Sequence, residues 1–506
     1  MPLNAPTSAS VLLSDEQVRR FITDGYLQLD CGLPAEVHAA IYDKLQWILH
    51  EEGNPGNNIL PAVPEMQRVL DSPVIRGALA GVLGPNYVLH PHRFVHNIEP
   101  AERTEEGTRI GKGSASFVGW HQDSHSPLAR PRHHYPRYAM ILYYPQDTPV
   151  AMGPTQVIPA THLHAAISET DKARGFQAPG PAGTCTLVHF DIAHGGSMNL
   201  ADRTRHMAKF VFARVDEPTA PSWDCRAEAW RTPENHQAPR ELPVVWANLW
   251  NWMIGQPERQ EKLPEGTLLG PQAISDRIAG WDANPFTRVN ALYTLAALGE
   301  TAVAPLCAEL ASHTESRWAE SAVVMENAAY ALAALGRPAV PALIGLLDHP
   351  SEWVQINALF ALGEVGPRAH RAVPRVIACL RHASHPVVRT ALDAIGQMQA
   401  GEQALPEIRH LLTESNPDWQ EPLYRKWTGE NQVRVNAMMA LLRTPTPSGA
   451  LLETVANALN DPCGYVGGFG VEILLRHPHQ ESLHAALAYL QSHRWDNSLN
   501  RGIRTY

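Results

Sequence analysis

The chain has 506 residues, of which 44% are hydrophobic and 18% are charged, and its formal net charge is -10. A chain of this length and composition forms two or more globular domains and is not a disordered tail. Because phosphate binding needs a concentrated basic surface, an acidic chain without a run of Lys or Arg is not expected to bind nucleic acid.

The sequence contains no apolar stretch long enough to span a membrane and no secretory leader pattern over residues 1–13. We therefore expect no contact with a membrane and a cytoplasmic location. Six cysteines are spread along the chain without a Cys-x-x-Cys pair. This spacing favours reduced thiols over a disulfide scaffold or a zinc ribbon.

Residues 1–220 are predicted to form an α+β domain. Ser14 and Gln17 form a capping box before an apolar helical stripe, and Gly25 ends that helix. The other predicted elements are helices over 35–50 and 73–83 and short apolar strands at 26–29, 138–144, 156–158, 186–190 and 207–212. A few helices followed by many short strands favour a β-sandwich or barrel core.

Residues 221–285 are predicted to be a linker between two domains. They contain Pro, polar stretches and an aromatic cluster of Trp246, Trp250 and Trp252. Large aromatic side chains in such a segment are expected to pack between the domains.

Residues 286–506 carry an internal repeat. Three segments share the pattern Asn-Ala-x-x-x-Leu at the same distance before a Gly, and they begin at Asn290, Asn327 and Asn357. Each combines two helices, a unit that buries its apolar face only when it is stacked on its neighbours. The pattern resembles HEAT-like repeats and predicts an all-α solenoid. Its role is either a scaffold that stabilises the first domain or forms a homodimer, or a concave surface that recruits a protein, carrier domain or large substrate.

The sharpest motif is the His-x-Asp sequence at His121 and Asp123. In an extended segment, residues two apart point to the same face, so both side chains can bind one ion. The best candidate for a third ligand is His194, which follows a β-like run and precedes two glycines. His189 is the rival, although its place inside a predicted strand favours a structural role. Two His and one carboxylate form the facial triad of non-haem iron(II) oxygenases, which leaves positions for a bidentate cosubstrate and dioxygen.

An oxygenase of this kind holds the distal carboxylate of 2-oxoglutarate. Arginine suits that anion, because it is always charged and forms a bidentate fork. Arg205 lies eleven residues after His194, on a strand predicted to run beside the metal strand. Arg203 is two residues away and could lie on the same face, so spacing alone does not choose between the two.

The loop that follows the metal motif is rich in Pro, Arg and His. It contains His125, His133 and His134, which we expect to be structural residues. The alternative is a lid that touches substrate.

The order of these segments resembles the phytanoyl-CoA dioxygenase family. The resemblance covers roughly residues 13–215. The matching segments are Leu13-Ser-Asp-Glu-Gln-Val, Asp24-Gly-Tyr-Leu, His121-Gln-Asp123, Met152-Gly-Pro-Thr-Gln-Val-Ile-Pro-Ala-Thr-His162 and His194-Gly-Gly-Ser-Met-Asn-Leu-Ala-Asp-Arg-Thr-Arg205. The resemblance implies a double-stranded β-helix of the jelly-roll or cupin type. It also implies iron on His121, Asp123 and His194, and 2-oxoglutarate on Arg205 in preference to Arg203.

Two departures from the family pattern bear on the cosubstrate site. Residues 100–116 form a longer stretch before the metal motif than is usual, which leaves Asn97 and Lys112 as upstream candidates for binding 2-oxoglutarate. Position 196 is Gly where several family members carry a Ser that assists the carboxylate. We expect Ser197 or a water molecule to substitute.

The resemblance implies an oxygenase that uses Fe(II), O2 and 2-oxoglutarate. It would hydroxylate or desaturate a small-molecule or carrier-bound metabolite and release succinate and CO2. Asp123 argues against halogenation, because halogenating relatives lack this carboxylate. The alternative function is an interaction protein, in which the repeats bind a partner and the first domain is a sensor or a degenerate oxygenase.

Overall fold

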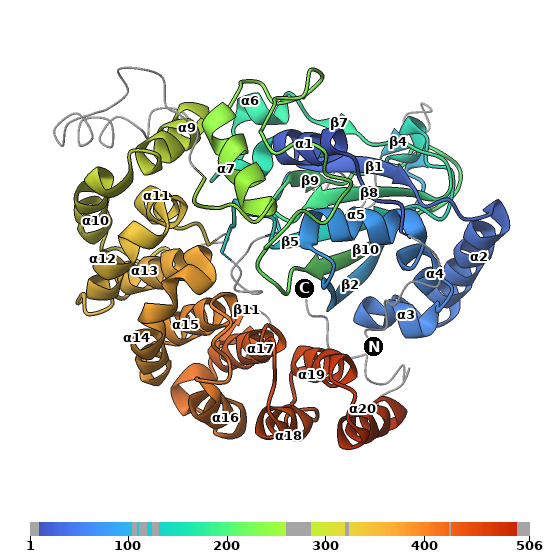
Figure 1. The fold of residues 1–506 in the computed structure, drawn as a ribbon. Helices are drawn as coiled ribbons and strands as arrows, with labels where there is room; N and C mark the ends of the chain where they lie inside the picture. Colours follow the sequence, from blue (N-terminus) through green and yellow to red (C-terminus); the bar gives the residue numbers. More distant parts are fainter. Residues whose placement is uncertain are drawn as a thin grey trace.

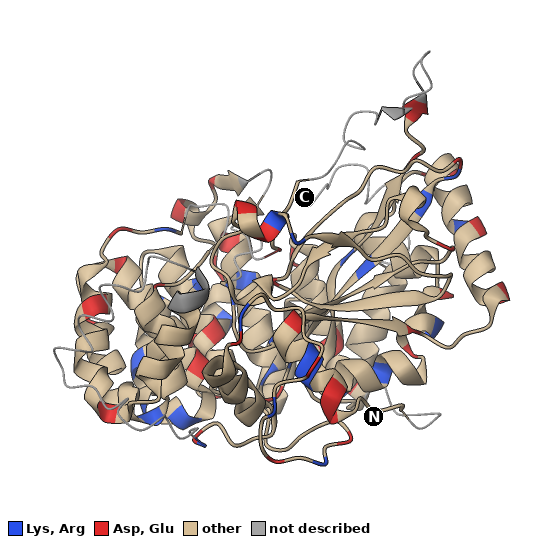
Figure 2. Cartoon of the chain, turned by 90° about the horizontal axis from the view of Figure 1, so that it is seen from above, with Lys and Arg blue, Asp and Glu red and all other residues tan. Residues whose placement is uncertain are grey.

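The computed structural model describes residues 10–103, 109–110, 119–123, 131–259, 285–318, 323–424 and 427–492. The chain forms a domain of sheets and flanking helices, and an arc of paired helices curves around one side of it (Figure 1). Seen from above, the two parts lie side by side, and acidic and basic residues are intermingled over both (Figure 2).

The first part of the chain, the β domain, contains two main antiparallel sheets. The larger has the order β1-β8-β5-β10-β2, and the smaller has the order β7-β6-β9. The strands are β1 (Tyr26–Asp30), β2 (Val88–Ile98), β5 (Tyr138–Tyr143), β6 (Gln156–Ile158), β7 (Phe176–Gln177), β8 (Thr184–His189), β9 (Ala193–Gly195) and β10 (Arg205–Ala213). Every residue of β5, β8 and β10 is buried, so the centre of the larger sheet is covered on both faces. Two small ribbons complete the strands: β3 (Glu102–Arg103) with β4 (Arg109–Ile110), and β11 (Pro422–Tyr424) with β12 (Trp427–Thr428).

The helices predicted between Ser14 and Gly25 and over 35–50 and 73–83 form in the β domain, together with three shorter helices that the sequence did not predict. In the predicted capping box, the Ser14 hydroxyl accepts a hydrogen bond from the Gln17 backbone, and the Gln17 side chain accepts one from the Ser14 backbone. Gly25 ends the helix in the left-handed region at φ 81°. The helices are α1 (Asp15–Asp24), α2 (Ala35–Glu51), α3 (Ile59–Ala62), α4 (Met66–Leu70), α5 (Pro73–Leu83) and α6 (Glu169–Lys172).

The predicted interdomain segment contains α7 (Pro243–Met253), which packs against α1 on one side and the first repeat helix on the other. All three tryptophans of this helix are buried. The ring of Trp252 stacks on Tyr135 of the β domain with the ring centroids 4.6 Å apart. The aromatic cluster therefore packs between the two parts of the chain.

The helices after α7 form two rows (Figure 1). The inner row, next to the β domain, is α9 (Pro285–Ala296), α11 (Asn327–Leu335), α13 (Glu352–Val365), α15 (His385–Gln397), α17 (Gly429–Leu442) and α19 (Gly464–Arg476). The outer helices are α10 (Val303–Ser312), α12 (Val340–Leu346), α14 (Val373–Ala378), α16 (Leu405–Thr413), α18 (Gly449–Asn457) and α20 (Gln480–Ser492). One of the repeated Asn residues links neighbouring repeats: the buried Asn357 side chain accepts a hydrogen bond from the Glu326 backbone at 2.8 Å. We call these helices the solenoid.

A membrane-spanning test on the described residues finds no single helix of sufficient length and apolar character. One sharply bent pair, Asn327–Leu335 with Arg337–Leu346, meets the test by length and composition when the two helices are taken together.

The inner row of the solenoid packs directly on the β domain. Hydrogen bonds at the two ends of this interface include Tyr293 Oη with His134 Nδ1 at 2.9 Å, Tyr465 Oη with His92 Nδ1 at 2.8 Å, and Arg476 Nη2 to the Tyr87 carbonyl at 2.7 Å. These contacts come from α9 at one end of the arc and from α19 at the other. The inner face of the solenoid is therefore occupied, over much of its length, by the β domain of the same chain.

Glu364 of α13 lies at the centre of this interface and is buried. Its Oε1 accepts hydrogen bonds from Arg137 Nε at 2.7 Å, His133 Nδ1 at 3.0 Å and Gln397 Nε2 at 3.0 Å. Burial opposes ionisation of this carboxyl, but Arg137 and His133 outweigh it and lower the pKa of Glu364 from 4.5 to about 2. The solenoid is thus joined to the β domain by a buried, charged contact.

This shift predicts how stability changes with pH. A carboxyl with a depressed pKa in the folded state contributes stability that is complete above its unfolded pKa and is lost as the pH falls toward the folded value. For Glu364 that window runs from pH 4.5 down to about 2. There we expect the unfolding free energy to fall by up to about 1.4 kcal/mol per pH unit through this group alone. Urea denaturation at several pH values should show a shallower dependence in Glu364→Gln, and an identical slope would contradict the assignment.

Candidate metal centre

Backbone pairing brings the first and third predicted ligands together. His121 and His194 form an isolated antiparallel bridge, in which each backbone N–H donates to the carbonyl of the other residue at 3.0 Å. In an antiparallel pair, residues directly opposite each other point to the same side. The two imidazole rings therefore lie together, with their centroids 4.3 Å apart.

Hydrogen bonds at Nδ1 set the tautomer of both histidines. His121 Nδ1 lies 3.1 Å from the Gly119 carbonyl, and His194 Nδ1 lies 3.0 Å from the Ile192 carbonyl. Because a carbonyl only accepts, each Nδ1 carries the hydrogen and each Nε2 presents a lone pair. Metal-binding histidines are oriented by this kind of contact.

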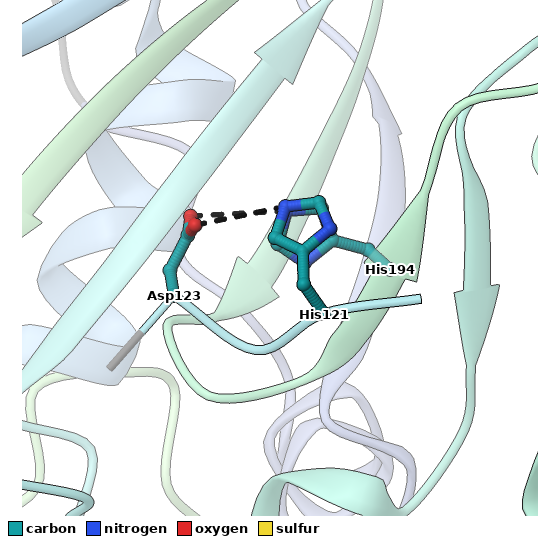
Figure 3. Close-up of side chains that lie close together, drawn as sticks. All are labelled: His121, Asp123 and His194. Atoms are coloured by element: carbon teal, nitrogen blue, oxygen red, sulfur yellow. Dashed lines mark ion pairs between the residues drawn. The ribbon is translucent and has the colours of Figure 1, made fainter. Parts of the chain in front are cut away.

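Asp123 completes a three-residue group whose side chains converge (Figure 3). Its Oδ1 lies 3.8 Å from His121 Nε2, and its Oδ2 lies 3.7 Å from His194 Nε2. Metal bonds of about 2.1 Å at right angles would place such atoms about 3 Å apart, so a contraction of less than about 1 Å would suit an ion. The donor set, two neutral nitrogens and one carboxylate, fits a divalent cation with open positions.

The surroundings keep the ligands in the form that binds metal. Burial, with the neighbouring His121, lowers the pKa of His194 to about 4, so its imidazole is neutral at ordinary pH. His194 and Asp123 are buried, whereas the side chain of His121 is 43% exposed. The site is therefore closed on the protein side and accessible beside His121.

Gln122 anchors the backbone between two ligands. Its side-chain amide points into the protein and lies within hydrogen-bonding distance of the carbonyls of Thr161 at 3.0 Å, His164 at 3.2 Å and Asp191 at 2.9 Å. These contacts help to fix the short segment between His121 and Asp123. Sequence reasoning missed this role, because its partners lie 39 to 69 residues away.

His189, the alternative candidate for the third ligand, lies outside the group formed by His121, Asp123 and His194. It is the last residue of β8, is buried, and its ring packs against His162 with centroids 5.0 Å apart. Its Nδ1 accepts a hydrogen bond from the Asp191 backbone at 3.2 Å. Among the described residues, the ligand-type group forms with His194 and without His189. His125 lies outside the described residues.

A potential anion site lies on β10 and on the turn that follows His194. Arg205 is only 1% exposed, and its Nε and Nη1 have no hydrogen-bond partner among the described residues. Ser197 is also buried, with its hydroxyl unpartnered in the same part of the chain. A buried guanidinium without a partner is costly, which favours an anionic ligand at this place. Arg203, by contrast, is exposed and stacks on Tyr42, so Arg205 is the arginine that faces inward.

The sheet register corrects the assignment of Asn97 to the cosubstrate site. Arg205 pairs with Ile98 and Met207 pairs with His96, whereas Asn97 pairs with His206. Since successive residues on a strand point to opposite faces, Asn97 lies on the face away from Arg205. The sheet thus offers His96 to the site in place of Asn97. Lys112 lies outside the described residues.

Lys209 is a site residue that sequence reasoning missed. It lies on the same face of β10 as Arg205, four residues further along, and is buried. Its Nζ lies 3.2 Å from Asp123 Oδ2. Strand alternation from Arg205 could have placed it on this face, but the contact with Asp123 is tertiary. An ammonium group here competes with a metal cation for the same carboxylate.

Family models match two separate parts of the chain. Residues 101–207, which include His121, Asp123, His194 and Arg205, match the family model of phytanoyl-CoA dioxygenase (PhyH). Residues 340–421 match the model of HEAT repeats. Both resemblances predicted from the sequence are confirmed over these ranges. No curated protein gives a significant match.

Several solved structures are similar at low identity. They include EctD from S. alaskensis with 2-oxoglutarate and 5-hydroxyectoine, at 17% identity over 52% of this chain and 90% of that one, with a TM-score of 0.34. The epimerase SnoN in complex with Fe3+, alpha ketoglutarate and nogalamycin RO is 18% identical over 45% and 95%, with a TM-score of 0.33. AviO1 from Streptomyces viridochromogenes is 17% identical over 40% and 96%, with a TM-score of 0.31.

The contact between Lys209 and Asp123 predicts an unusual mutational effect. In Lys209→Met, the competing ammonium is removed while the volume is nearly kept. We expect Co(II) to bind about tenfold more tightly, a change of about 1.4 kcal/mol. Visible absorption of the cobalt protein measures this affinity. Equal or weaker binding would show that Lys209 serves mainly to orient Asp123.

Proposed function

We propose that this chain is an Fe(II)- and 2-oxoglutarate-dependent oxygenase that acts on a small-molecule or carrier-bound metabolite. The observation that carries the proposal is the combination of two features. His121, Asp123 and His194 converge as a facial donor set, and the buried Arg205 lacks a partner among the described residues. The match of residues 101–207 to the phytanoyl-CoA dioxygenase model supports the same class.

We further propose that the two sheets form the double-stranded β-helix that the sequence resemblance implies. A five-stranded and a three-stranded antiparallel sheet support this. The metal ligand His194 lies on β9 of the smaller sheet, and Arg205 lies on β10 of the larger. A site between two such sheets would receive residues from both, and most of its walls would be rigid.

Each residue would have a defined task. His121, Asp123 and His194 would hold iron, while Arg205 and Ser197 would bind the distal carboxylate of 2-oxoglutarate. When bound, iron and 2-oxoglutarate would supply oxidation by O2 coupled to decarboxylation of the cosubstrate, with release of succinate and CO2. The buried ligands would exclude water, and the exposed side of His121 would admit substrate.

We propose hydroxylation or desaturation as the reaction, and not halogenation. Asp123 supports this choice, because its carboxylate would occupy the coordination position that a halide needs. The alternative of an interaction protein, with a partner bound by the repeats, remains a prediction without a supporting observation of its own.

Anaerobic addition of Fe(II) and 2-oxoglutarate tests the function directly. We expect a weak visible charge-transfer band in the wild-type protein, and succinate formation once O2 and substrate are present. Asp123→Ala should lose both, because it lacks one of three ligands. The control Asp418→Ala, an exposed position on the solenoid, should behave as wild type. A wild-type protein without the band would refute the proposal.

Two neighbouring arginines offer a matched test of cosubstrate binding. We expect Arg205→Ala to raise the KM for 2-oxoglutarate at least about thirtyfold, because losing a buried charge-assisted contact costs about 2 kcal/mol or more. Arg203→Ala, on the exposed face, should leave it within about twofold of wild type. Steady-state succinate release measures both. Equal effects of the two substitutions on this KM would show that Arg205 does not bind 2-oxoglutarate.

A further inference from the structure

Segment 131–137 begins eight positions after Asp123 and contacts the solenoid. Pro131 forms an isolated bridge with Val323, and the Arg132 N–H donates to the Val323 carbonyl at 3.1 Å. The hydroxyl of Tyr330, on α11, donates to the Arg132 carbonyl at 2.8 Å. The backbone of this segment is therefore held by the solenoid itself.

Side chains of the same segment converge on one solenoid residue. Glu364 Oε1 accepts from both His133 and Arg137, and Arg137 also forms an ion pair with Glu217 of the β domain. The ring of His134 stacks on Tyr330, with centroids 4.3 Å apart and an interplanar angle of 13°. Because Glu364 and Arg137 are both buried, neither charge has water as an alternative partner.

From this segment, hydrogen bonds lead to the metal motif. The His133 N–H donates to Asp191 Oδ2 at 3.4 Å, and the Asp191 carbonyl accepts from Gln122 Nε2 at 2.9 Å. A second route passes through the His164 carbonyl, which accepts from Arg132 Nη1 at 2.8 Å and from Gln122 Nε2 at 3.2 Å. Both routes end on Gln122, whose neighbours in the chain are two of the ligands.

We propose that the solenoid is a positioning part of the metal centre, and that Glu364 and Tyr330 act on His121, Asp123 and His194 through segment 131–137 and Gln122. The proposal rests on the metal centre of the proposed function, but not on its substrate or reaction. Catalytic geometry tolerates displacements of only about 0.5 Å, and a shift of 1 Å far from the chemistry can cost about a hundredfold. Without the solenoid, segment 131–137 would lose its contacts with Val323, Tyr330 and Glu364.

This assignment also gives the repeats a defined task. Repeat proteins commonly bind partners on their concave surface, but here that surface contacts the β domain of the same chain. The partner of the concave surface is thus the β domain of the same chain, and a few contacts connect this interface to the segment that carries His121 and Asp123. His133 and His134 were expected to be structural from the sequence, and they pack against Glu364, Tyr293 and Tyr330.

The test compares two Glu→Gln substitutions in the full chain. Glu364→Gln keeps the shape of the side chain but removes the buried charge. Glu407→Gln is the matched control on the outer helix α16, where Glu407 pairs with the exposed Arg381. Co(II) affinity is measured from visible absorption, well below the unfolding temperature of each variant, and the Tm is measured in parallel. Cobalt binding requires no turnover, so a protein that binds Co(II) but forms no succinate would refute the proposed function and leave this test intact.

We expect Glu364→Gln to weaken Co(II) binding about tenfold or more, in the range found for partners that orient metal ligands. Its cobalt spectrum should change shape, and the amides of His121 and His194 should exchange hydrogen faster. Glu407→Gln should match wild type in all three. If Glu364→Gln fails to fold, Tyr330→Phe decides, since it removes one hydroxyl and should still weaken Co(II) binding a few-fold. A lower Tm with wild-type Co(II) affinity and spectrum would overturn the proposal and leave the solenoid a stabilising scaffold.

Discussion

The site depends on one pair of backbone hydrogen bonds. His121 and His194 are joined N–H to carbonyl in both directions at 3.0 Å, and this bridge sets the two imidazoles side by side. Asp123 then falls on the same side as His121, because it lies two residues further along an extended segment. The side-chain amide of Gln122 and the contact of Lys209 Nζ with Asp123 Oδ2 at 3.2 Å add to the bridge in holding the His-x-Asp motif. Lys209 on β10 then contacts Asp123 from the larger sheet.

The buried contact of Glu364 with His133 and Arg137 shows why the β domain and the solenoid should be regarded as one folding unit. Glu364 belongs to the solenoid, yet its hydrogen-bond partners His133 and Arg137 belong to the β domain. A buried carboxylate left without these partners would be strongly destabilising. The charged interface therefore makes the correct docking of the solenoid a condition for the native β domain. In this arrangement the repeats cover one side of the β domain and are not a separate module.

The parts of this structure that were predictable from the sequence are those set by local patterns. The capping box at Ser14 and the alternation of short apolar strands in the β domain depend on neighbours a few residues away, and the repeats were visible because their Asn-Ala-x-x-x-Leu pattern recurs. The ligands His121, Asp123 and His194 were found through spacing and resemblance, and the choice of Arg205 over Arg203 came from the resemblance before the geometry supported it. Asn97 was misassigned because strand register decides which face a residue takes. Two contacts could not be predicted from the sequence: that of Lys209 with Asp123 and that of Glu364 with Arg137. Tertiary packing joins these pairs, whose members are 86 and 227 positions apart in the chain.

The central claim is that one divalent metal ion binds to His121, Asp123 and His194. An anomalous difference map from crystals of the full chain, grown anaerobically with Fe(II) and 2-oxoglutarate, tests it most directly. We predict one iron peak about 2 Å from His121 Nε2, His194 Nε2 and a carboxylate oxygen of Asp123, with 2-oxoglutarate density reaching toward Arg205. A peak coordinated by any other set of residues, or no peak at full loading, would contradict the claim.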